Sequence, residues 1–125
     1  MKLFAPASRL ALAALLACSV SANAADPWST TDKALAAAFV VASVADWRQT
    51  REITKYEGVY ETNPFLGHHP SNRRIDTYFV VSRLLTLGAA HFIPSGYRTA
   101  FLAGNVVVQL WYTTNNARIG LKVGF

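Results

Sequence analysis

Three apolar stretches of helical length follow the first 24 residues of the chain. They run from about residue 31 to 53, from 75 to 93 and from 97 to 116. Each is close to the length of about 17 to 25 residues that a helix needs to cross a bilayer. Over the whole chain 52% of residues are hydrophobic and only 15% are charged, whereas a typical soluble domain has about 25% charged residues. We therefore expect an all-α fold, a small membrane bundle of about three transmembrane helices in residues 25–125.

Residues 1–24 have the pattern of a secretory signal peptide. Lys2 and Arg9 form a basic start, residues 10–20 are apolar, and residues 22–24 read Ala-Asn-Ala. Small residues at this place are typical of a signal peptidase site. We expect cleavage before Ala25, which would leave the following segment outside the bacterial inner membrane.

The one cysteine of the chain, Cys18, allows another form of processing. Residues 15–18 read Leu-Leu-Ala-Cys, which is similar to the site at which lipoproteins are acylated and cleaved. The alternative is therefore an exported lipoprotein anchored at Cys18, or a periplasmic helical protein. A single cysteine excludes a disulfide framework.

The basic residues are distributed unevenly around the three apolar stretches. Lys33 and Arg98 lie on the side where the first stretch begins, and seven basic residues lie in the 48–74 region or after residue 116. The seven are Arg48, Arg51, Lys55, Arg73, Arg74, Arg118 and Lys122. This asymmetry is what the positive-inside rule predicts for an inner-membrane protein whose 54–72 loop and tail lie in the cytoplasm. The spread of these residues, with a net charge of only +5, argues against nucleic acid as a partner.

Polar residues within the apolar stretches should face the interior of the bundle. At 1.5 Å per residue, Asp46 lies roughly 10 Å from the inner end of its helix and Arg83 roughly 12 Å from the inner end of the next. Gln109 has a comparable depth, and Asp46 and Arg83 are natural partners. The predicted polar layer consists of Asp46, Thr50, Arg83, Gln109 and Asn105. We interpret it as hydrogen bonding that holds the helices together; the alternative is a small transport or proton-relay element.

The loop over residues 54–72 carries a second group of polar residues. Asn63 followed by Pro64 predicts a turn at residues 65–66. The residues of interest in this loop are Glu61, Asn63, Pro64, His68, His69 and Pro70. Adjacent histidines beside a glutamate could bind a divalent cation, but the spacing matches no metal motif, and we expect no metal.

Glycine-rich phosphate loops and the common nucleophile and zinc motifs do not occur in the sequence. We therefore expect neither catalytic residues nor a cofactor, and an enzyme is the less favoured class. The expected partners are the lipid bilayer and, beyond it, other membrane proteins or further copies of the chain.

One part of the chain resembles an uncharacterised group of small bacterial and phage membrane proteins. Residues 46–50 read Asp-Trp-Arg-Gln-Thr, and residues 61–71 combine Glu-x-Asn-Pro-x-Leu-Gly with His-Pro-Ser. The resemblance runs from about residue 46 to 78. It implies residence in a membrane and a structured inner loop, and it marks Asp46, Thr50, Glu61, Asn63, Pro64, His69 and Pro70; no activity comes with it.

Overall fold

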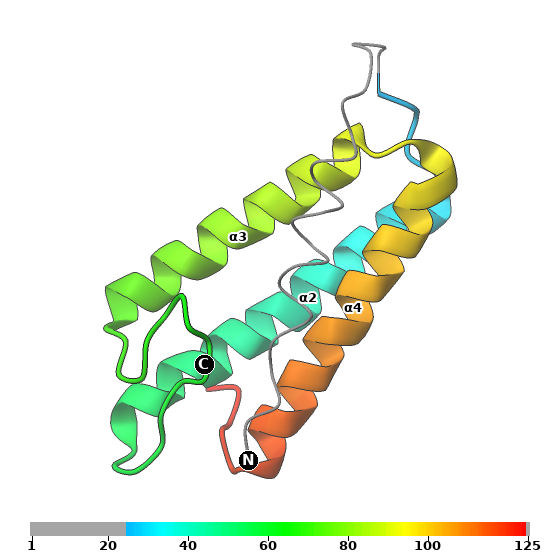
Figure 1. Cartoon of the computed structure of the whole chain (residues 1–125). Coiled ribbons are helices and arrows are strands. Elements are labelled where there is room, and N and C mark those ends of the chain that lie inside the picture. The colour runs from blue at the N-terminus through cyan, green and yellow to red at the C-terminus, as the bar shows by residue number, and fades with distance from the viewer. Residues whose placement is uncertain (1–24, 125) are drawn as a thin grey trace.

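The computed structural model describes residues 25–124, which form three long α-helices (Figure 1). The helices are α2 (Thr30–Glu52), α3 (Asn72–Phe92) and α4 (Ser95–Arg118), and a short 3-10 helix, η1 (Ile53–Lys55), follows α2. No strand occurs in this part of the chain, so the predicted all-α class is confirmed. The predicted signal peptide and Cys18 lie outside the described residues.

The helix ends differ from the predicted bounds by up to three residues. The largest difference is at α3, which begins at Asn72 because the Ser71 hydroxyl accepts a hydrogen bond from the Arg74 amide at 3.3 Å. α2 begins with a capping box in which the Ser29 hydroxyl and the Asp32 carboxylate each accept a backbone amide of the other residue, both at 3.0 Å. Both ends thus follow local hydrogen bonds that satisfy amides without a helical partner.

α2 is the central helix, because it packs against both α4 and α3, while α3 and α4 contact each other less (Figure 1). α2 and α4 run in the same direction: Thr99 donates to Asp32 near their starts at 2.7 Å, and Gln49 donates to the Thr113 carbonyl near their ends at 3.2 Å. α3 runs antiparallel to both. The turn at Ile93 and Pro94 joins α3 directly to α4.

The two ends of the bundle differ in charge. We call the end where α2 and α4 begin the Arg98 end, and the end where they finish the basic end. All seven basic residues that the sequence analysis assigns to the cytoplasmic side lie at the basic end. This end contains the last turns of α2 and α4 and the start of α3. The charge asymmetry along the sequence is therefore an asymmetry in space.

One cluster of buried apolar residues lies towards the basic end, while Phe39, Ala90 and Leu102 are buried elsewhere along the bundle. Leu66, Ile75 and Phe79 form a buried cluster, with Trp47 and Tyr78 packed against it. Leu66 comes from the loop, so this cluster fixes the loop to α3 and α2. The tail returns to the bundle, where Leu121 is buried and its carbonyl accepts from Gln49 at 3.4 Å.

Hydropathy along the three helices is moderate. Within residues 25–124, no helix contains a stretch that is both long enough and apolar enough to cross a membrane.

Candidate functional site

Asp46 is the centre of a buried polar cluster that joins all three helices. Its carboxylate accepts hydrogen bonds from Gln109 at 3.1 Å and from Asn116 at 2.9 Å, both on α4. Arg83 of α3 lies 3.5 Å from the same carboxylate and donates to the Gln109 side-chain oxygen at 2.9 Å. We call Asp46, Arg83, Gln109 and Asn116 the Asp46 cluster. It closes a ring in which Gln109 bridges the carboxylate and the guanidinium.

Arg83 reaches this cluster through aromatic surroundings. Its guanidinium carbon lies 4.6 Å from the centroid of the Phe79 ring and 5.9 Å from that of Phe39. Ring faces attract a cation, and the attraction is larger where water is excluded.

Among the described residues, three buried side-chain atoms have no hydrogen-bond partner: the Ser43 hydroxyl, the Gln49 amide oxygen and the Arg83 Nε.

Of the predicted polar layer, the structure brings Asp46, Arg83 and Gln109 into contact and places the other two residues differently. The Thr50 hydroxyl is buried and donates to the Asp46 main-chain carbonyl at 2.9 Å. Asn105 lies one turn from Gln109 and donates to the Phe101 carbonyl at 2.9 Å. The fourth member of the cluster is Asn116, which the spacing along α4 places on the face of Gln109.

Arg98 forms a second buried site that the sequence analysis missed. Its side chain is fully buried, and it donates to the carbonyls of Ala90 at 2.9 Å, Ile93 at 3.0 Å and His91 at 3.4 Å, which end α3. It also donates to the Pro27 carbonyl at 3.1 Å. The final carbonyls of a helix have no partner within the helix, so Arg98 supplies the C-terminal cap of α3 from the first turn of α4.

The charge of Arg98 is balanced by Asp32. The two groups are 3.7 Å apart and both are buried. The guanidinium also lies 5.3 Å from the centroid of the Trp28 ring. Nearby, the Ser95 amide donates to the Asp26 carboxylate at 2.9 Å, and this hydrogen bond lowers the pKa of Asp26 below its ordinary value. The Arg98 end is thus closed by contacts among the chain before α2 and both ends of the α3–α4 turn.

Asp76, near the start of α3, pairs with two side chains of α2. Its carboxylate accepts from Arg51 at 2.6 Å and from the Trp47 indole at 2.8 Å. All three side chains lie at the basic end of the bundle. This contact holds the start of α3 against the end of α2.

Residues 61–67 of the loop form an ordered turn. The Glu61 carboxylate accepts the amides of Thr62 and Asn63 at 2.9 and 2.8 Å. The Asn63 side chain accepts the Phe65 amide at 3.0 Å, and its carbonyl accepts the amide of Gly67 at 3.1 Å. The turn covers residues 64–66, one residue more than the predicted 65–66, and Gly67 has a φ of +77°, which favours glycine. These contacts give Glu61 and Asn63 a local structural role.

The loop histidines lie on the surface. His68 is exposed and its ring is 5.6 Å from that of Tyr60, while its carbonyl accepts the Glu61 amide at 3.0 Å. His69 is exposed beside the buried Pro70. Within residues 25–124, no group of three or more histidine, cysteine or acidic side chains is arranged to hold a metal ion.

Comparison of the chain with protein-family models, with curated proteins and with solved structures found no match.

Proposed function

We propose that the chain is a small integral protein of the bacterial inner membrane, with a structural or interaction role and no catalytic activity. Its three helices would lie together in the bilayer, with the basic end towards the cytoplasm. The Asp46 cluster and Arg98 would hold the helices together from within. The outward faces would contact lipid, other membrane proteins or further copies of the chain.

The observation that carries this proposal is the reversed distribution of polar and apolar side chains. The outward faces of all three helices expose large apolar residues, including Val41 at 71%, Leu84 at 65% and Val107 at 66%. Polar and charged side chains are instead buried: Asp32, Ser43, Asp46, Gln49, Thr50, Arg98 and Gln109. Polar groups within a bilayer face the bundle interior, whereas polar groups of a protein in water face outward. Mean hydropathy along a helix combines both faces, so it understates how apolar the outward face is.

Helix length and charge also support a bilayer location. The helices contain 23, 21 and 24 residues, which at 1.5 Å per residue gives about 32 to 36 Å. The hydrocarbon region is about 30 Å thick. The gathering of basic residues at one end agrees with the positive-inside rule. The exposed Trp111 and Tyr112 lie towards the same end, and such residues are common at the membrane–water interface.

The contacts within the Asp46 cluster favour a structural role over a proton or ion path. Both carboxylate oxygens of Asp46 accept hydrogen bonds from α4, and Gln109 uses its oxygen and its nitrogen within the cluster. A relay needs a group that can exchange partners, whereas these groups bind each other. The transport alternative would require the ring to open.

The proposal is tested by placing one acidic residue at two exposed positions of α2. Val41 lies near the middle of α2, and Ala34 is exposed in its first turns. In a bilayer Val41→Asp should cost about 2.5 to 3.5 kcal/mol of insertion free energy, because Asp is charged at mid-depth. Ala34→Asp should cost much less, because an acidic residue near a helix start lies close to the interface and is favoured by the helix dipole.

The measurement is the fraction of full-length protein that enters the membrane fraction of expressing cells. We expect Val41→Asp to lower this fraction strongly and Ala34→Asp to leave it near that of the unchanged chain. A bilayer location would be contradicted if the two variants showed the same membrane fraction and both proteins folded in buffer without detergent. An exposed Asp is harmless in water.

A further inference from the structure

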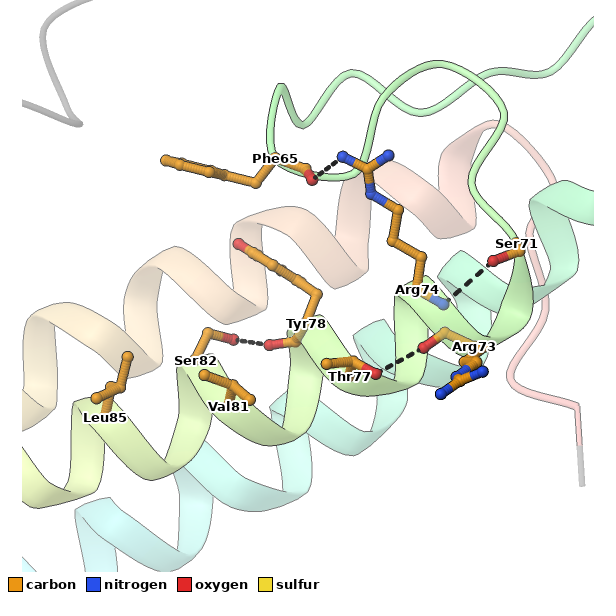
Figure 2. Close-up of a pocket in the computed structure, with 9 residues that line it drawn as sticks. All are labelled: Phe65, Ser71, Arg73, Arg74, Thr77, Tyr78, Val81, Ser82 and Leu85. Carbon is orange, nitrogen blue, oxygen red and sulfur yellow. Dashed lines mark hydrogen bonds between the residues drawn. The ribbon is translucent and has the colours of Figure 1, made fainter.

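A groove about 750 Å³ in volume runs along the outer face of α3, beneath the ordered loop (Figure 2). It extends from Ser71 at the start of α3 to Leu85, which at 1.5 Å per residue is about 21 Å. Half of a bilayer, from headgroups to midplane, is about 20 to 22 Å thick. The groove therefore matches one leaflet in length, with its start at the basic end.

The part of the groove farthest from the start of α3 is apolar. Val81 and Leu85 line it and are 49% and 68% exposed. The nearby hydroxyls of Thr77 and Ser82 donate to carbonyls of α3 itself, at 2.9 and 2.6 Å, so they are already satisfied. This part offers an uncovered apolar surface to a hydrocarbon chain.

The opposite end of the groove carries positive charge. Arg73 and Arg74 both line it, and neither forms an ion pair within residues 25–124. Figure 2 shows Arg74 extending from α3 to the loop, where one guanidinium nitrogen donates to the Phe65 carbonyl at 3.0 Å. Arginine has five donors in a planar group that suits phosphate. No acidic residue lines the groove.

The loop provides an aromatic wall. The Phe65 ring lies above α3 and is stacked with Tyr78 at a centroid distance of 6.5 Å, yet Phe65 is 70% exposed. The turn that holds Phe65 in place is stabilised by Glu61 and Asn63, whose side chains accept backbone amides of the turn itself. The loop thus places an apolar ring between the arginines and the hydrocarbon-facing part of the groove.

We infer that this groove binds an anionic phospholipid of the cytoplasmic leaflet, with its phosphate at Arg73 and Arg74 and an acyl chain along Val81 and Leu85. The inference rests on the proposed function, since that orientation puts the arginines at headgroup level and Leu85 near the midplane. Charge selects the headgroup, and the apolar groove selects a lipid over a free phosphate.

The test is titration of the purified full-length protein in detergent with phosphatidylglycerol or phosphatidylcholine of the same acyl chains, followed by native mass spectrometry. Each arginine near an anionic headgroup is worth about fivefold in affinity. We expect phosphatidylglycerol to bind more tightly than phosphatidylcholine, and Arg73→Gln/Arg74→Gln to lower its affinity about 25-fold. Arg73→Gln alone should lower it about fivefold without touching the loop, because only Arg74 is hydrogen-bonded to Phe65.

Two controls separate this groove from general attraction to the basic end. Arg118→Gln/Lys122→Gln removes the same charge from the same end outside the groove and should leave the preference intact. Val81→Ser/Leu85→Ser should weaken both lipids. Equal affinity for the two lipids, an equal effect of the control pair, or glycerol phosphate binding as tightly as phosphatidylglycerol would each overturn the inference. A chain that fails the bilayer test yet shows this selectivity would refute the proposed function and leave the groove as a lipid site.

Discussion

Replacing Arg98 with methionine is expected to lower the free energy of unfolding by about 3 to 5 kcal/mol. The substitution leaves the buried Asp32 without its cation and the last carbonyls of α3 without their donor. Removing one partner of a buried ion pair typically has this cost, because the other charge stays buried. Methionine keeps much of the side-chain length, so packing changes less than hydrogen bonding does. The measurement is chemical unfolding of the purified protein, monitored by the circular-dichroism signal of its helices.

Arg118→Met is the matched control, because Arg118 is exposed and donates a long hydrogen bond to the Asn115 side chain at 3.5 Å. We expect it to change stability by less than about 0.5 kcal/mol, as surface substitutions usually do. Arg98→Lys should fall between the two, since lysine keeps the charge but lacks the planar group that reaches several carbonyls. If Arg98→Met were as stable as Arg118→Met, the buried cap would have no energetic role.

Asp46→Leu and Arg83→Leu are each expected to destabilise the protein by about 3 to 5 kcal/mol, for the same reason. The double variant should cost less than the sum of the two, because neither charge is then left buried alone. Contacting charged residues typically show a coupling of about 0.5 to 3 kcal/mol. Gln109 loses its partners in the double variant as well, so stability should return only in part. Unfolding of all four proteins under the same conditions gives the coupling directly.

Asp46→Asn separates charge from hydrogen bonding in this cycle. An amide can still accept from Gln109 or Asn116, so this variant should be more stable than Asp46→Leu. Additivity of the two leucine substitutions to within about 0.3 to 0.5 kcal/mol would mean that Asp46 and Arg83 are not coupled, despite their separation of 3.5 Å.

The helices and the approximate level of Asp46, Arg83 and Gln109 could be predicted because both follow from local regularities. A helix rises by a fixed amount per residue, so equal distances from a helix end give equal depth in neighbouring helices. The turn at Asn63 and Pro64 was predictable for a similar reason, since the side chain of Asn63 and the ring of Pro64 act on the adjacent backbone.

The partners of Arg98 and Asp76 could not be predicted, because they depend on how separate helices meet. Arg98 is in the first turn of α4, where a charged residue usually reaches water. It is buried here because the short turn at Pro94 brings the end of α3 within its reach. Asp76 shares a side of α3 with Arg83, yet its carboxylate pairs with Arg51 of α2 at 2.6 Å. Neither contact leaves a periodic pattern in the sequence.

The central claim, that the bundle lies within a bilayer, is tested most directly by alkaline carbonate extraction of membranes from cells that express the full-length chain, followed by flotation on a density gradient. Flotation separates membrane-embedded protein from aggregates, which sediment. We expect the protein to stay with the floating membranes after extraction and to enter solution only with detergent. Release by carbonate of folded, detergent-free protein would contradict the account.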